Sequence, residues 1–224
     1  ALDPKDGIRL LPDLDAARRA LQLGDPKDAI APLDRLLAKN PTNVPALLTL
    51  GQAQLATGRP AEAIATYKRV TAIAPSNALA WFDLGNAYAA GAAGGDAAFA
   101  EAKAAYEHAL TLSPRHADTY LNYASLLAVR RLPEDARKML LRARAAGVAD
   151  PTIEAELGVL ETFRKDPGAA KAAFERALAL NPRQPEALEG LGKLTYAAGE
   201  FGMAAGYYAR ALDAHPTAPI AKTL

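Results

Sequence analysis

The histidines and carboxylates are the side chains best suited to chemistry, but their spacing argues against it. No two of the three histidines, His108, His116 and His215, are four residues apart, the spacing that lets one helix hold a metal ion. Asp118 follows His116 closely, but no serine or cysteine completes a nucleophilic arrangement with them. The carboxylates are spread along the chain and not paired for acid–base work. We therefore predict a non-enzyme that needs no metal and no cofactor.

A glycine cluster at residues 91–95 invites comparison with a phosphate-binding loop. The cluster lacks the Gly-Lys-Ser/Thr ending and follows an expected helix instead of a strand, so the mechanism of such a loop fails. We interpret residues 91–96 as a loop inserted between two helices.

A basic segment offers a second candidate site. A solvated outer surface is its default interpretation, and contact with an anionic partner is the alternative. The basic residues are Arg130, Arg131, Arg137, Lys138, Arg142 and Arg144.

The composition excludes several classes of protein. The 26 basic and 25 acidic residues give a net charge of +1, which is no general reason to bind nucleic acid or an anionic membrane. No cysteine is present, so no disulfide or thiolate site forms. No apolar run approaches the roughly 20 residues that span a bilayer, so we predict no membrane insertion.

A small residue recurs every 34 residues along the chain, with one step of 39, and indicates stacked helix–turn–helix repeats. This column consists of Ala29, Ala63, Ala102, Ala136, Ala170 and Ala204. A column of large residues follows at Leu33, Tyr67, Tyr106, Leu140, Phe174 and Tyr208. Another small column comes earlier in each unit, at Ala17, Gly51, Gly85, Ala124, Gly158 and Gly192. We expect all three columns to be buried where paired helices cross.

Local signals predict where the helices begin and end. Pro26, Pro60, Pro133 and Pro167 mark the first turns of second helices, where a missing N–H is tolerated. Asp25 and Asp166 can cap two of these helices. Pro32 is expected to kink its helix. In the fourth unit, Arg131 stands where Gly24, Gly58 and Gly199 mark turns, and a boundary is expected at Asp150-Pro151 because Val148 replaces the closing proline.

These columns resemble the tetratricopeptide repeat (TPR) family. Residues 81–88 (WFDLGNAY) match the first helix of that repeat, and Ala170, Phe174, Ala177 and Pro182 match the second half. The resemblance implies an all-α, right-handed solenoid of about six helix-turn-helix repeats. The predicted ranges are a lead-in or linker at 1–9, repeats at 10–43, 44–77, 78–116, 117–150, 151–184 and 185–218, and a tail at 219–224.

The resemblance also implies that the first helices line a concave groove for an extended peptide or a partner helix. Packing between neighbouring first helices is the alternative interpretation of some apolar groove positions. The candidate binding residues are Leu14, Arg18, Leu48, Gln52, Leu55, Phe82, Asn86, Leu121, Asn122, Ser125, Val159, Glu189, Lys193 and Tyr196.

A known binding mode of the family clamps a C-terminal carboxylate between two asparagines and several basic residues. Asn86 and Asn122 match the asparagines, but Phe82, Thr152 and Glu156 stand where lysine or arginine is wanted. Hydrogen bonding between adjacent repeats and general recognition of a peptide backbone are the other interpretations of these asparagines.

The leading functional hypothesis is a protein-interaction scaffold of bacterial origin. The alternative is the accessory tail of a larger enzyme, because residues 2–8 (LDPKDGI) weakly resemble the junction before the TPR tails of some bacterial sulfatases. The chain begins without methionine, so we interpret it as part of a longer protein. Its compartment, cytoplasm or periplasm, stays open, and the sulfatase resemblance favours export. Self-association through the C-terminal repeat is expected, because little sequence follows to cap it.

Overall fold

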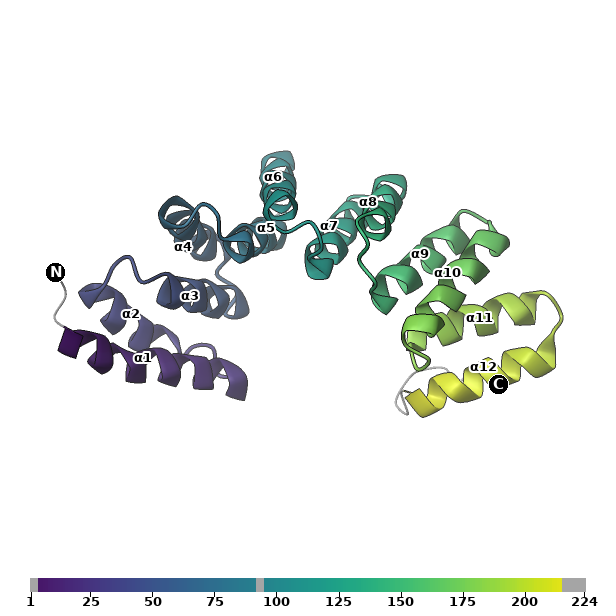
Figure 1. The fold of residues 1–224 in the computed structure, drawn as a ribbon, viewed down its shortest axis with the longest axis horizontal. Helices are drawn as coiled ribbons and strands as arrows, with labels where there is room; N and C mark the ends of the chain where they lie inside the picture. The colour runs from purple at the N-terminus through teal and green to yellow at the C-terminus, as the bar shows by residue number, and fades with distance from the viewer. Residues whose placement is uncertain (1–3, 92–94, 215–224) are drawn as a thin grey trace. The chain divides into compact units, whose positions relative to one another are not determined.

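The computed structural model describes residues 4–91 and 95–214 and divides the chain into two compact units. Unit 1 is Ala1–Pro114 and unit 2 is Arg115–Leu224, and each contains three helical hairpins in its described part (Figure 1). The helices of unit 1 are α1 (Pro4–Leu23), α2 (Ile30–Lys39), α3 (Val44–Ala56), α4 (Pro60–Ile73), α5 (Ala78–Gly91) and α6 (Asp96–Leu112). Those of unit 2 are α7 (Ala117–Val129), α8 (Pro133–Ala145), α9 (Pro151–Phe163), α10 (Pro167–Leu180), α11 (Pro185–Ala197) and α12 (Phe201–Ala214).

Within each unit the helices pack in sequence order. The first helix of every hairpin contacts the second, and successive hairpins meet through pairs such as α2 with α3 and α10 with α11. First helices of neighbouring hairpins also touch, as α3 with α5 and α9 with α11. Because each hairpin buries its faces against its neighbours along the chain, this packing confirms the predicted all-α solenoid.

Each hairpin is closed by a small residue of the first helix facing a large residue of the second. Four hairpins pair glycine with an aromatic ring: Gly51 with Tyr67, Gly85 with Tyr106, Gly158 with Phe174, and Gly192 with Tyr208. A Cβ atom added at Gly51 would lie 2.4 Å from Cζ of Tyr67. The other two hairpins carry alanine and leucine in these columns, at Ala17 and Leu33 and at Ala124 and Leu140. Where the first-helix residue is alanine instead of glycine, the second-helix residue is leucine instead of an aromatic residue, as close packing requires.

The predicted small column of the second helices is buried in all six hairpins. Ala29, Ala63, Ala102, Ala136, Ala170 and Ala204 are each at most 1% exposed. Of the large column only Tyr208 is partly exposed. The repeat pattern therefore predicted the core.

The turns inside five hairpins place one residue in the left-handed region of backbone space. These residues are Gly24, Gly58, Arg131, Lys165 and Gly199, with φ of 84°, 73°, 60°, 60° and 81°. Arg131 therefore has the left-handed backbone conformation of the turn glycines at the same column. Lys165 has this conformation as well, which the sequence did not lead us to expect. A side chain with a Cβ atom is strained there.

The starts of several second helices are as predicted, but the start of α2 is not. Pro60, Pro133 and Pro167 begin α4, α8 and α10, and Asp166 accepts a hydrogen bond from the Ala169 N–H at 2.9 Å. Asp150 likewise caps α9 by accepting from the N–H groups of residues 152 and 153, which confirms the boundary at Asp150-Pro151.

The segment before α2 is a tighter turn, and the predicted role of Pro26 as a first-turn residue is wrong. The N–H groups of residues 28–30 each bond to the carbonyl three residues earlier. α2 begins only at Ile30, so Pro32 lies in its first turn. The predicted kink is wrong because the N–H that Pro32 lacks has no helical carbonyl to bond there.

Two predicted irregular segments are partly helical. α1 begins at Pro4, inside the predicted lead-in, since proline is tolerated in a first turn. Gly91 ends α5 and Asp96 begins α6, so the ends of the predicted inserted loop belong to helices. Residues 92–94 and the predicted tail at 219–224 lie outside the described residues. In the part of the chain that is described, no helix is both long and apolar enough to cross a membrane.

The glycine–aromatic pairs predict strong coupling between Gly51 and Tyr67. We expect Gly51→Ala to cost about 1–3 kcal/mol by overpacking, and Tyr67→Leu to cost a similar amount through the cavity it leaves. The double variant recreates the alanine–leucine combination of two other hairpins and should cost at least 1 kcal/mol less than the sum, about the scale of coupling between contacting residues. Urea unfolding of the four proteins measures the cycle. Additive effects would show that the two residues do not limit the approach of α3 and α4.

The left-handed turns predict that glycine stabilises two of them. Arg131→Gly and Lys165→Gly should each raise the free energy of unfolding by about 0.5–1 kcal/mol, because glycine removes the strain at positive φ. The control is Gly58→Ala, whose Cβ would meet no atom within 4 Å and which should therefore lose stability only through its φ of 73°. Thermal unfolding followed by circular dichroism measures all three. Destabilisation of both glycine variants would contradict the strain argument.

Candidate functional site

Three predicted binding residues of unit 2 line a pocket between α7 and α9 with a volume of about 300 Å³. We call it the α7–α9 pocket. α7 contributes Leu121, Asn122, Ala124, Ser125 and Ala128, α8 contributes Ala136 and Leu140, and α9 contributes Thr152, Glu156 and Leu160. The volume lies at the lower end of the range for ligand sites and suits one side chain of a larger ligand.

The local sequence explains why these side chains meet. Ala136 and Leu140 are each 1% exposed and belong to the core of the α7–α8 hairpin. The cap at Asp150 fixes where α9 begins. Thr152, Glu156 and Leu160 then follow at steps of four residues, which places them on one face of α9.

Glu156 is the charged residue among those that line the pocket. It forms no hydrogen bond or ion pair with any residue that the structure describes. Partial loss of water around its carboxyl group, followed by the negative charge of Glu186, raises its pKa. With Thr152 and Glu156 beside Asn122, the pocket lacks the basic residues of a carboxylate clamp.

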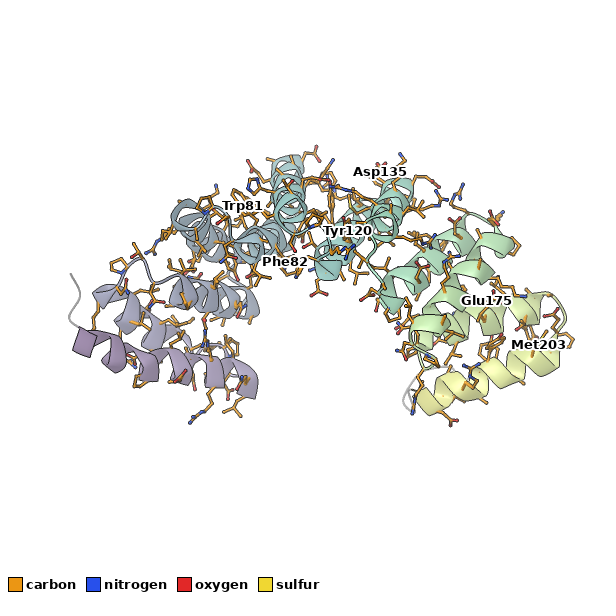
Figure 2. The ribbon with its side chains drawn as sticks, in the orientation of Figure 1. Trp81, Phe82, Tyr120, Asp135, Glu175 and Met203 are labelled. Carbon is orange, nitrogen blue, oxygen red and sulfur yellow. The ribbon has the colours of Figure 1, made fainter. Side chains whose placement is uncertain are left out.

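The predicted groove residues of unit 1 do not line either described pocket. Gln52 is exposed, whereas Leu48, Leu55, Phe82 and Asn86 are half-buried. Asn86 accepts a hydrogen bond from the Tyr106 hydroxyl at 2.8 Å, within the α5–α6 hairpin. Phe82, labelled in Figure 2, has its ring 6.3 Å from the ring of Tyr106.

Asp83 was not among the predicted residues of unit 1, although its setting is unusual. Burial raises the pKa of Asp83 to about 6. Burial, and then the charge of Asp83, raises the pKa of the Tyr67 and Tyr106 hydroxyls, and the buried Tyr67 hydroxyl has no hydrogen-bond partner among the described residues. The sequence contains a pattern that could have pointed to Asp83. Asp83 and Glu156 each stand two residues before a first-helix glycine, Gly85 and Gly158.

The remaining predicted residues serve different roles. Leu14 is 8% exposed and packs in the core of unit 1, which favours the packing interpretation, while Arg18 is exposed. Val159 packs against the core cluster around Phe174. On α11, Lys193 pairs with Glu189 at 3.6 Å, and the exposed Tyr196 contacts the ring of Phe201 edge-on at 5.2 Å between centroids.

A second pocket, of about 310 Å³, lies among α4, α5 and α6 in unit 1. Trp81 stacks on His108 with 4.1 Å between ring centroids and donates from Nε1 to the Pro75 carbonyl oxygen at 2.8 Å (Figure 2 labels Trp81). A hydrogen bond with Tyr88 leads the effects that raise the pKa of Lys68. Because Trp81, His108, Lys68 and Tyr88 already contact one another or the backbone, this pocket is the weaker candidate.

Two arginines of the predicted basic segment, Arg137 and Arg144, are paired with carboxylates of α9. Glu154 accepts two hydrogen bonds from Arg144, at 2.8 and 2.6 Å, and one from Arg176 at 2.8 Å. Glu161 accepts from Arg137 at 2.5 Å and from Arg164 at 2.8 Å. Both carboxylates are 5% exposed. The expectation of an outer surface of solvated charges, or of an anionic partner there, is therefore wrong for Arg137 and Arg144, because buried carboxylates of the next hairpin already hold them.

Comparisons with known proteins agree with the fold. Two family models, both described as tetratricopeptide repeat, match residues 20–84 and 163–219, together more than half of the chain. The chain belongs to the tetratricopeptide repeat family. No curated protein matches it significantly.

Several solved structures are similar over most of the chain. PilW, described as a widely conserved type IV pilus biogenesis factor, has a TM-score of 0.70 and 20% identity over 99% of both chains. PilF of Pseudomonas aeruginosa has a TM-score of 0.63 and 26% identity over 76% of both chains. YrrB, described as a TPR protein with an unusual peptide-binding site, has a TM-score of 0.58 and 19% identity, over 86% of this chain and 98% of its own. At such identities, PilW and YrrB support the fold alone.

The arginine–glutamate contacts predict a pH-dependent contribution of Glu154. Burial raises the pKa of Glu154. Arg144 and Arg176 donate hydrogen bonds to its carboxylate and place positive charge beside it, and together these effects outweigh burial, so the pKa is lowered. A lowered folded-state pKa gives stability that is present above the unfolded value of about 4.3 and is lost as the pH falls through the folded value. We expect Glu154→Gln to cost about 1–3 kcal/mol at pH 7 and less at pH values below about 4.

Urea unfolding at both pH values measures this effect. The matched control is Asp135→Asn, which removes an exposed pair with Lys138 at 3.0 Å and should change stability by less than about 0.5 kcal/mol. Equal effects of the two variants at pH 7 would show that the Glu154 contacts do not stabilise unit 2.

Proposed function

We propose that this chain is a non-catalytic protein-interaction scaffold that binds a peptide or partner helix against its first helices, with the α7–α9 pocket as an anchoring point. The family supports a scaffold, and YrrB is itself described as having a peptide-binding site. The observation that carries the proposal is the pocket, where Leu121, Asn122 and Ser125 of the predicted groove meet Leu160 of the next hairpin. Apolar walls with a few polar groups are typical of binding sites.

The side chains around this pocket leave room for a ligand without loss of the fold. Ser125 and Ala128 are small and exposed, so they shape the opening instead of filling the core. The close packing that holds the hairpin uses Ala124, Ala136 and Leu140 below them. A ligand side chain that enters therefore gains apolar contact while the core stays in place.

The proposal predicts that filling the pocket weakens binding. Peptides are first selected on the intact chain from a random display library, and Kd is then measured by fluorescence anisotropy. Ala128→Phe should raise Kd at least about tenfold, equivalent to about 1.4 kcal/mol, because the ring occupies the pocket. The matched control is Ala179→Phe on the exposed surface of α10, which should leave Kd unchanged. Failure to select any peptide, or equal loss in both variants, would contradict the proposal.

Two further hypotheses from the sequence remain proposals. Self-association through the C-terminal hairpin is supported by Phe201 and Met203 on α12, which are 62% and 53% exposed (Figure 2 labels Met203). The accessory-tail hypothesis rests on residues 2–8 alone, and residues 1–3 lie outside the described residues.

A further inference from the structure

We propose that the α7–α9 pocket selects a cationic side chain, lysine or arginine, from the bound peptide. This inference rests on the proposed function, because it specifies which part of a peptide the pocket accepts. It reverses the charge preference of the carboxylate clamp that Asn86 and Asn122 first suggested.

The charges on α9 carry the inference. This helix has three glutamates, and two of them each receive two arginines, Glu154 from Arg144 and Arg176, and Glu161 from Arg137 and Arg164. The third, Glu156, faces the pocket and has no cationic partner among the residues that the structure describes. Glu156 is exposed at the opening of the pocket, so an incoming cation can pair with a carboxylate whose charge no described residue already neutralises.

The neighbouring charges act in the same direction. Glu186 is close enough to Glu156 to affect its pKa, and it adds negative potential at this site. Lys193 of α11, one of the predicted groove residues, is paired with Glu189. An anionic ligand group would meet repulsion here and find no cation among the pocket residues.

The walls of the pocket suit the rest of such a side chain. Leu121, Ala128 and Leu160 offer apolar contact for an aliphatic stem, and Glu156 lies one helical turn from Leu160. Lysine and arginine combine an apolar stem with a charged end, so they match this arrangement. Thr152 lies one turn beyond Glu156 and presents a further oxygen to an ammonium or guanidinium group.

The test uses the intact chain and two sets of probes. Small probes are n-butylammonium, 1-butanol and butyrate, which share a short alkyl chain and differ in charge, and methyl NMR signals of Leu121 and Leu160 report binding. Peptide probes are variants of the selected sequences in which one lysine or arginine at a time is replaced by norleucine. We expect n-butylammonium to shift the methyl signals at a concentration at least about tenfold lower than 1-butanol, and norleucine at one position to raise Kd by a similar factor.

Matched variants identify the carboxylate responsible. Glu156→Gln should remove the preference for the cation with both sets of probes. Glu175→Gln on α10, whose residue is labelled in Figure 2 and lies outside the pocket, should leave the preference unchanged. Circular dichroism confirms that both variants fold, as expected for exposed positions.

The outcomes separate the two proposals. If charged and neutral probes bind the pocket equally, or if Glu156→Gln keeps the preference, the cation selectivity is overturned while peptide binding at the pocket stands. If neither the small probes nor any peptide shifts the methyl signals, the pocket is not a binding site, and both proposals fail.

Discussion

The close approach of two helices in each hairpin is the constraint on which the rest of the structure depends. In four hairpins a glycine lets an aromatic ring of the second helix lie so close to the first helix that an added Cβ atom would clash with the ring. In the other two, alanine accompanies leucine, so the summed size of the pair is roughly kept. Because the paired volumes are matched, the two helices of a hairpin can pack closely in either combination, and the small column of the second helices is buried throughout.

α9 shows how one such helix divides its surface between packing and binding. Glu154 and Glu161 lie seven residues apart on one face, where Arg137 and Arg144 of α8 join two neighbouring hairpins and Arg176 of α10 pairs within the same hairpin. Thr152, Glu156 and Leu160 lie on the face that opens into the pocket. Seven residues are about two helical turns, so both faces persist along the helix without interfering. The same helix therefore stabilises unit 2 and offers a site.

The sequence predicted the fold well because the buried columns recur and a periodic signal survives local exceptions. Arg131 stands at the column of the turn glycines, and the structure gives it their left-handed backbone, which the residue type alone does not indicate. The sequence misjudged Pro32, whose effect depends on where α2 begins, and the arginines of α8, whose carboxylate partners lie 10 and 24 residues away. Part of the pocket was predicted from α7, but Leu160 was missed, since a site between two hairpins depends on the spacing of helices and not on a motif within one.

The net charge of +1 conceals an uneven distribution of unpaired charge. Arg137, Arg144, Arg164 and Arg176 are matched by two buried glutamates of α9. The carboxylates of Asp83 in unit 1 and Glu156 in unit 2 stand two residues before the first-helix glycine, and both have a raised pKa, Asp83 through burial and Glu156 through partial loss of water and then the charge of Glu186. Asp83 is half-buried, where an acid without a cationic partner among the described residues is unfavourable, whereas Glu156 is exposed at the pocket. Structural pairing therefore uses much of the basic charge near α9, and the acid left without a partner there is the one that faces a pocket.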